Sequence, residues 1–236
     1  MASNCCFMDN LLLKYMGEGL SSDPSRASQA IKPIVTISRE YGCPSKPIAQ
    51  LLTDTINKKL PEGSHLKWRF INKEVLESAA RELQLNPADV KYLLSVGEKS
   101  LMEDFLVSFS STYVSNLKVK HTLTKVVSTI AQSGHVVLVG RGSAAILQGK
   151  PRSLHVRLMA PEAWRLQAVI SSRNISSAEA KHLIETTDKK RSALYELILG
   201  QKMNPYIFDV AFNCSTLSKH QIVEGILSMM AAREMI

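Results

Sequence analysis

Residues 34–52 read IVTISREYGCPSKPIAQLL, and this stretch decides the fold. Its apolar start, residues 34–37, is typical of a buried strand, and residues 47–59 have the spacing of an amphipathic helix. The polar turn Ser38–Lys46 joins the two. A strand, a tight turn and a helix in this order can point backbone N–H groups and a helix dipole at a phosphate.

The turn is a partial match to a phosphate-binding loop. The usual motif is G-x-x-x-x-G-K-[ST], whose lysine reaches the β- and γ-phosphates and whose hydroxyl holds magnesium. Here Lys46 comes four positions after Gly42 without a second glycine, and the next residue, Pro47, has neither a hydroxyl nor an N–H. Taken alone, the motif favours a plain strand-to-helix connection.

The rest of the chain alternates short apolar runs with helical patterns. Strands are predicted at residues 34–37, 68–71, 136–139, 154–159 and 209–213. Helices are predicted at residues 47–59, 73–83, 87–95, 101–132, 144–148, 162–173, 177–199 and 219–233. This alternation predicts an α/β domain over residues 31–236, with a mostly parallel sheet and helices on both faces. Residues 1–30 are predicted to be an extension that packs on the domain, or alternatively a dimerisation arm that makes a homo-oligomer.

Composition narrows the class of protein. The 236 residues are 45% hydrophobic and 21% charged, which is ordinary for a globular protein, and the net charge of +8 favours anionic ligands. No apolar run approaches the ~20 residues of a membrane span. The four cysteines (Cys5, Cys6, Cys43 and Cys214) lack C-x-x-C spacing. Reduced thiols and a cytoplasmic location are therefore predicted.

Three turns place functional side chains at the carboxyl ends of predicted strands, where open α/β sheets bind ligands. They are Ser38–Lys46, Asn72, and residues 140–143, Gly-Arg-Gly-Ser. An arginine at such a glycine-rich turn can fork onto phosphate oxygens, or it can instead pair with a carboxylate or cap a helix. The late run Lys189-Lys190-Arg191 suits either a solvated helix face or a lid over a phosphoryl group.

Other chemistries are disfavoured by the same sequence. The six histidines are scattered without His-x-x-x-His spacing, and no G-x-S-x-G nucleophile elbow is present. A zinc site and a hydrolase triad are therefore not expected.

Six segments in order resemble the cytidylate-kinase-like family. They are residues 37–42 (ISREYG), 48–49 (IA), 70–74 (FINKE), 139–142 (VGRG), 188–193 (DKKRSA) and 208–215 (FDVAFNCS). The resemblance covers roughly residues 33–230 and leaves the first thirty outside. It implies a P-loop nucleoside monophosphate kinase fold, with three layers and five parallel strands in the order 2-3-1-4-5.

The resemblance also implies roles for individual residues. The first turn would cradle the donor phosphates, and Arg141 with Gly142 would bind the acceptor phosphate. Asn72 and Glu74 would border the acceptor pocket. The donor-binding set would be Ser38, Arg39, Gly42, Cys43, Ser45, Lys46 and Ile48. The catalytic set would be Lys46, Arg141, Lys189 and Arg191.

Departures from the family pattern bear on the cofactors. The family loop typically reads S-R-E-Y-G-S-G-G-R-E-I-A, whereas this chain has Pro44 and Ser45 at the two later glycines and Pro47 at the glutamate. Asn72 replaces a usual aspartate, and Val139 stands where better-characterised nucleotide kinases carry a carboxylate. The resemblance implies ATP and Mg²⁺, but these positions lack groups that would anchor the metal.

Two functions follow as hypotheses. The first is a cytidylate-like kinase that transfers phosphate from ATP to a nucleoside monophosphate or a related small acceptor. The second is a non-catalytic nucleotide- or anion-binding protein that kept the scaffold. Nucleic-acid binding driven by the positive net charge is a weaker third hypothesis, because no aromatic-plus-basic recognition motif supports it. A small-molecule partner is predicted, without a membrane.

Overall fold

A parallel sheet of five strands forms the centre of the molecule in this computed structural model, which describes residues 32–64, 66–71 and 116–236. The strands are β1 (Ile34–Arg39), β2 (Arg69–Ile71), β3 (Val136–Val139), β4 (Ser153–Met159) and β5 (Val210–Asn213). They lie in the order β2-β3-β1-β4-β5, and every neighbouring pair is parallel. The predicted α/β class and strand order are confirmed.

The central strand, β1, is the segment that opens the sequence. It pairs with β3 on one side and β4 on the other, with Ile37 opposite Val139 and Val156. Residues 34–38 of β1 are all buried, as a strand covered on both faces must be. The register also sets Ser38 beside Arg157 of β4, at the end of the sheet where the polar turns lie.

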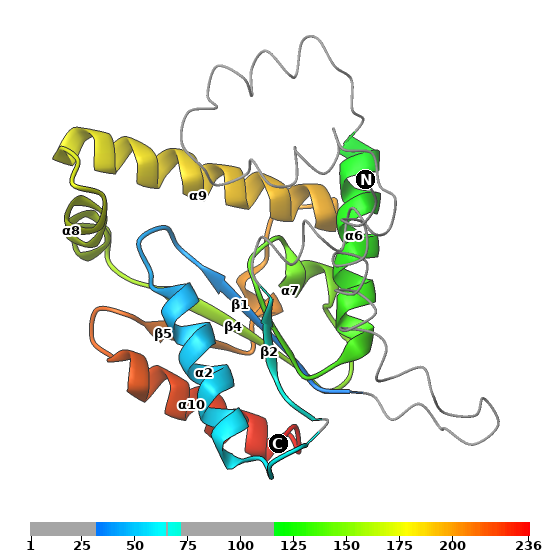
Figure 1. Ribbon diagram of the computed structural model, residues 1–236. Helices are drawn as coiled ribbons and strands as arrows, with labels where there is room; N and C mark the ends of the chain where they lie inside the picture. The colour runs from blue at the N-terminus through cyan, green and yellow to red at the C-terminus, as the bar shows by residue number, and fades with distance from the viewer. Residues whose placement is uncertain (1–31, 65, 72–115) are drawn as a thin grey trace, which may run out of the picture.

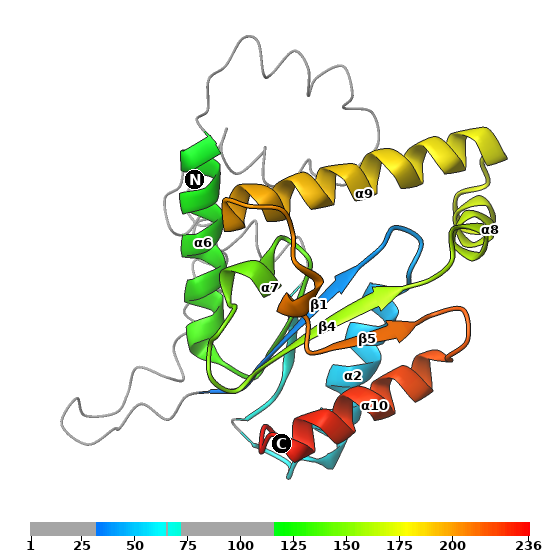
Figure 2. The ribbon, with the colours of Figure 1, turned by 180° about the vertical axis from the view of Figure 1, so that it is seen from behind.

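Helices cover both faces of the sheet and make three layers (Figures 1 and 2). On one face lie α2 (Ser45–Lys59) and α10 (Lys219–Ala232). These two helices pack on each other and on side chains of β1 and β4 that point to this face. On the other face lie α6 (Asn116–Ser133), α7 (Ser143–Ile146) and α9 (Ser177–Leu199). The 3-10 turn η1 (Pro205–Ile207) and α8 (Glu162–Arg173) complete the described elements.

Two apolar cores form as a result. Residues of β1, α2, β4 and α10 make one, in which Ile48, Leu52 and Ile226 are fully buried. Residues of β3, α6, α7 and α9 make the other, around Val127 and Leu138. Trp68 is buried in the first core, as expected for a packing residue.

Element boundaries follow local signals closely. The strand Val136–Val139 and the helices Glu162–Arg173 and Ser177–Leu199 have the bounds that the sequence predicts. The helix predicted at 144–148 runs over Ser143–Ile146 instead. Three predicted features lie outside the described residues: the 1–30 extension and the helices at 73–83 and 87–95. Of the helix predicted at 101–132, the described part begins at Asn116.

Within the described residues, no helix combines the length and the apolar character needed to cross a membrane.

Candidate functional site

The turn between β1 and α2 is closed by its own hydrogen bonds. Three of its backbone N–H groups donate to nearby carbonyls: Cys43 to Glu40, Ser45 to Cys43 and Ile48 to Pro44. Pro44 and Pro47 have no N–H to offer. A phosphate-binding loop works by leaving such groups directed at the ligand, and this turn uses three of them internally.

Gly42 is the point where the turn meets the rest of the site. Its φ of +96° is in the left-handed region that favours glycine. A Cβ at this position would lie 3.1 Å from both Cβ and the carbonyl oxygen of Arg165 in α8. Glycine therefore allows the turn to lie directly against α8.

The second turn, after β3, also has backbone in the left-handed region. Gly140, Arg141 and Gly142 all have left-handed backbone, with φ of +72°, +57° and +66°. Such a conformation is unfavourable for arginine, and residues held this way concentrate at functional sites. A Cβ on Gly140 would lie 1.9 Å from Nη1 of Arg39. The glycine thus makes room for the Arg39 guanidinium beside the turn.

Five arginines gather where β1, β3 and β4 end, and we call them the arginine cluster. Arg39 ends β1, Arg141 follows β3, Arg157 is in β4, Arg165 is in α8 and Arg191 is in α9. Burial, followed by the charges of Arg191 and Arg141, lowers the pKa of Arg39 to about 9. Burial also lowers the pKa of Arg191, although Asp188 opposes that shift. Positive charge is concentrated at this edge.

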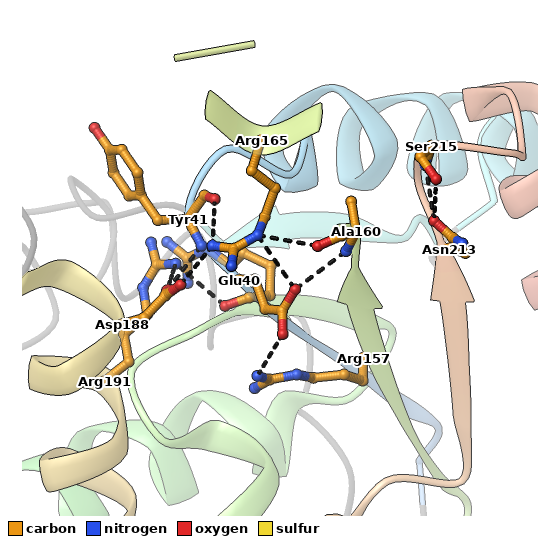
Figure 3. Close-up of polar contacts among 10 residues, drawn as sticks. Glu40, Tyr41, Arg157, Ala160, Arg165, Asp188, Arg191, Asn213 and Ser215 are labelled. Carbon is orange, nitrogen blue, oxygen red and sulfur yellow. Dashed lines mark hydrogen bonds and ion pairs between the residues drawn. The ribbon is translucent and has the colours of Figure 1, made fainter. Parts of the chain in front are cut away.

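Two carboxylates sit inside the arginine cluster (Figure 3). Glu40 accepts the backbone N–H of Ala160 at 3.1 Å and pairs with Nε of Arg165 at 3.5 Å and with Arg157 at 3.9 Å. Asp188 accepts from Arg165 at 2.7 Å, from the backbone N–H of Tyr41 at 2.8 Å and from Arg191 at 3.4 Å. Arg157, Arg165 and Arg191 thus pair with these two carboxylates, and Arg165 pairs with both.

The helix α9 packs over the end of β1, through contacts with Ser38 and Arg39. Tyr195 lies seven residues after Asp188, two helical turns along the same face, and its hydroxyl hydrogen-bonds the Ser38 hydroxyl. Burial raises the pKa of Tyr195. The Arg191 guanidinium lies 5.5 Å from the Tyr41 ring centre and donates to the carbonyl of Arg39 at 3.1 Å. The cluster is thus held between the sheet end and α9.

The structure brings together some of the sequence-predicted residues. Ser38, Arg39, Arg141 and Arg191 lie at the cluster, and Gly142 belongs to the Arg141 turn. Gly42, Cys43, Ser45 and Ile48 form the first turn and the start of α2. Lys46 and Lys189 have exposed side chains. Asn72 and Glu74 lie outside the described residues. The functional roles of all these residues remain predictions.

Cys43 is a buried part of the apolar core beside Cys214. A hydrogen bond with Cys214, together with burial, raises the pKa of the Cys43 thiol. A thiol that resists ionisation is a poor nucleophile, so the residue is better explained as a small side chain that fills the turn.

Sequence reasoning missed several residues of the site. Arg157 had a visible signal, because a charged residue in the apolar run of β4 needs a partner or a ligand. Asp188 also had a signal, because it is spaced i, i+3 from the predicted Arg191 and so lies on the same face of α9. Arg165 had no local signal, because its partners Glu40, Tyr41 and Asp188 are more than twenty positions away.

The residues present fit one of the two implied cofactors. Guanidinium groups are good partners for nucleotide phosphates, so the arginine cluster suits ATP or a nucleoside monophosphate. Mg²⁺ prefers carboxylate oxygens, and the two carboxylates of the cluster are both paired with arginine. Within the described ranges, no three His, Cys, Asp or Glu side chains gather as metal ligands. The described donor set does not fit Mg²⁺.

One solved structure has a similar fold. The chain is similar to a solved, uncharacterized protein from Eubacterium ventriosum ATCC 27560, with a TM-score of 0.58 and 14% identity over 85% of this chain and 99% of that one. The TT1252 protein from Thermus thermophilus aligns over 86% of this chain and 98% of its own, with 16% identity and a TM-score of 0.42. No curated protein matches this sequence.

The model of the cytidylate kinase-like family matches residues 34–216. That match begins at the first residue of β1 and continues beyond the end of β5, so it includes both turns and all five arginines of the cluster. The chain belongs to the cytidylate kinase-like family.

Proposed function

We propose that this protein is a nucleotide kinase that transfers a phosphoryl group from ATP to a nucleoside monophosphate or a related small acceptor. Family membership supports kinase activity and nucleotide binding in general. The observation that carries the finer proposal is the arginine cluster, in which side chains from β1, the β3 turn, β4, α8 and α9 meet at one sheet edge. Ligands bind at this edge in open α/β sheets.

The cluster suits the electrostatic demands of phosphoryl transfer. Negative charge is spread over the oxygens of the transferring group, and the enzyme acts mainly by positioning it and offsetting that charge. In this proposal Arg39, Arg141 and Arg191 contact the phosphates of donor and acceptor. Cations held in place before the reaction stabilise developing charge without reorganisation, and the half-buried Arg191 is held in that way by the carbonyl of Arg39 and by Asp188.

The exposed lysines complete the proposed machinery. Lys46 at the start of α2 and Lys189 in α9 have exposed side chains at elements that border the cluster. Each would swing onto a phosphate when the nucleotide binds. Asn72 and Glu74 would border the acceptor, and the first turn would contact the donor through Ser38, Ser45 and neighbouring groups.

A second candidate is a non-catalytic protein that binds nucleotides or other anions. The closed first turn favours it specifically, because Cys43, Ser45 and Ile48 donate their N–H groups internally. Pro47 removes another donor and the hydroxyl that would hold a metal. Such a turn would bind a triphosphate weakly while the arginine cluster still bound a single phosphate group.

Calorimetry with ATP and CMP, with and without Mg²⁺, tests both candidates at the level of binding. The kinase proposal expects millimolar or tighter binding of a donor and an acceptor, and loss of binding in Arg141→Met. Arg173→Met is the matched control, because this arginine is exposed at the end of α8. Absence of binding to every nucleotide tried would exclude the kinase, and would leave the non-catalytic candidate only as a protein that binds other anions.

A coupled assay for ADP production then separates the two. The kinase proposal expects turnover in the parent that falls in Lys46→Ala and in Arg141→Ala. Nucleotide binding without turnover would favour the non-catalytic candidate. Equal turnover in the parent and both variants would remove these two residues from the catalytic assignment.

A further inference from the structure

Asp188 is bound as an anionic ligand would be. One of its carboxylate oxygens accepts the backbone N–H of Tyr41 at 2.8 Å and Nη1 of Arg191 at 3.4 Å. The other accepts Nη1 of Arg165 at 2.7 Å. One backbone N–H from the first turn and two guanidinium groups from α8 and α9 therefore surround a single anionic group (Figure 3).

These three donors are also the kind that recognises phosphate. Backbone N–H groups at a strand-to-helix turn and arginine forks are standard partners of phosphate oxygens. Carboxylate and phosphate oxygens accept the same hydrogen bonds, but a phosphate carries more charge and more acceptors. The site is built for an anion, and a side chain of the protein occupies it.

The donors are held in place independently of Asp188. Arg165 also donates to the carbonyls of Ala160 at 3.0 Å and Tyr41 at 3.2 Å. Arg191 donates to the carbonyl of Arg39 at 3.1 Å, and its guanidinium packs over the Tyr41 ring. If the Asp188 side chain rotated away, these contacts would keep both arginines beside the Tyr41 N–H. The Asp188 side chain is 28% exposed, which gives it a route to solvent.

We propose that the Tyr41 N–H, Arg165 and Arg191 form a phosphate cradle, and that Asp188 is an internal plug that a ligand phosphate displaces. This inference rests on the proposed function, since it assigns a phosphate position within the same site. The chemistry suits either a terminal phosphate of a nucleotide or free pyrophosphate. Exchange favours the ligand because a phosphate carries more charge and more acceptor oxygens than the Asp188 carboxylate that it replaces.

Competition by the plug sets the expected size of the effect. An internal group that occupies the site in most molecules lowers the apparent affinity by the fraction of molecules in which the site is open. Removing the plug's charge should therefore tighten anion binding. For a site open in about one molecule in ten, the gain is about 10-fold.

Calorimetry with inorganic pyrophosphate at fixed ionic strength tests the plug. Asp188→Asn should bind pyrophosphate about 10-fold more tightly than the parent, and ATP should show a gain in the same direction. Asp54→Asn is the matched control, because it removes the same charge from an exposed residue of α2, whose carboxylate accepts a hydrogen bond from Gln50. The control should change affinity by less than about twofold, the scale of a screened surface charge.

A second measurement uses the parent protein and so does not depend on how a variant folds. The backbone amide resonance of Tyr41 should shift when pyrophosphate displaces Asp188 from it. Adding Arg165→Met to Asp188→Asn should abolish the gain in affinity, because the cradle then loses a donor.

Several outcomes would overturn the cradle. They are equal or weaker pyrophosphate binding in Asp188→Asn, an equal gain in Asp54→Asn, and saturation by pyrophosphate without a shift at Tyr41. These outcomes are distinct from failure of the proposed function. That failure appears as a parent that binds neither ATP nor CMP, whereas the cradle is judged by the ratio of pyrophosphate affinities between Asp188→Asn and the parent. A gain with pyrophosphate but not with ATP would assign the cradle to the free anion.

Discussion

The same two strands, β1 and β4, carry a polar network at each end, and the two networks are built differently. At the carboxyl end, the five arginines of the cluster gather, and three of them pair with Glu40 and Asp188. Toward the amino end, His155 of β4 lies beside Thr36 of β1, and each polar group of that network has a partner close at hand.

The network at the amino end is satisfied in detail. Nδ1 of His155 lies 2.8 Å from the Thr36 hydroxyl, and Nε2 lies 3.1 Å from the Ser153 hydroxyl. Asp209 accepts the backbone N–H of His155 at 2.6 Å and the guanidinium of Arg233 at 2.8 Å. Arg233 in turn donates to the carbonyl of Ser153 at 2.8 Å. This network joins β1, β4, the start of β5 and the end of α10.

The difference fits the proposal that the amino end serves the fold and the carboxyl end binds an anion. Buried polar groups stabilise a protein when their hydrogen bonds are complete, as at the amino end. At the carboxyl end, burial and then like charges lower the pKa of Arg39, which means that the charged form is held at a cost in free energy. Proteins keep such arrangements where an anion will compensate them.

The largest expected effect comes from Arg39. Arg39→Met should weaken ATP or pyrophosphate binding by about 10- to 100-fold, the size of a lost charge-assisted contact. The free energy of unfolding should hold or rise, because repulsion from Arg141 and Arg191 is relieved. Calorimetry and thermal unfolding of the same sample measure the two effects.

Gly140→Ala checks the same assignment without changing charge. The added methyl would collide with the Arg39 guanidinium and force it out of place, so binding should fall in this variant too. Two results would contradict the difference between the two ends. They are undiminished binding in Arg39→Met, and a loss of stability in Arg39→Met as large as that expected for a variant of the amino-end network.

Asp209 gives the converse result at the amino end. Burial opposes its ionisation, yet hydrogen bonds from Arg233 and the His155 N–H lower its pKa overall. Asp209→Ala should cost about 2 kcal/mol in the free energy of unfolding, because it leaves Arg233 and a strand N–H without their acceptor. Urea unfolding measures the loss. Pyrophosphate affinity should stay within about twofold of the parent, a change of well under the roughly 1.4 kcal/mol of a tenfold step, because Asp209 belongs to the network at the other end of the strands. A large drop in affinity would show that the two networks are coupled.

The fold was readable from the sequence because its signals are local. Apolar runs mark β1 and β3, and capping boxes at Ser176 and Ser218 begin α9 and α10. The strand order came from the resemblance to a known family, and the sheet confirms it.

The site was readable only in part because its contacts are long-range. Arg141 and Arg191 stand in recognisable motifs, but the bond between Tyr41 and Asp188 spans 147 positions and depends on how α9 crosses the sheet. The closed first turn is a middle case. Its two prolines are visible in the sequence, whereas the internal use of its N–H groups depends on the turn's geometry.

The pH dependence of stability should reveal the amino-end network. Burial lowers the pKa of His155, although Asp209 acts in the opposite direction. The unfolded chain, with a histidine pKa near 6.5, then binds a proton more readily than the folded protein. Stability should therefore be full above about pH 6.5 and fall as the pH drops, by at most about 1.4 kcal/mol per pH unit for one histidine.

Urea unfolding between pH 5 and 8 measures this slope. His155→Gln should flatten it, and His220→Gln, at an exposed histidine of α10, should leave it unchanged. His135 contributes a slope of the same sign, because burial and nearby cations lower its pKa as well. Some slope should therefore remain in His155→Gln. A slope equal to that of the parent would mean that protonation of His155 does not destabilise the folded protein.

The smallest expected effect compares the two capping boxes. Ser176 at the start of α9 accepts the N–H of Glu179, and Ser218 at the start of α10 accepts that of Gln221. Either serine changed to alanine should cost about 0.5 to 1 kcal/mol, because a helix-end N–H loses its acceptor. α9 carries Asp188 and Arg191 to the arginine cluster, whereas α10 packs on the opposite face. Hydrogen exchange should therefore show faster opening around Asp188 in Ser176→Ala but not in Ser218→Ala. Equal behaviour of the two variants there would mean that the contacts of Asp188 and Arg191 hold α9 in place without help from its first turn.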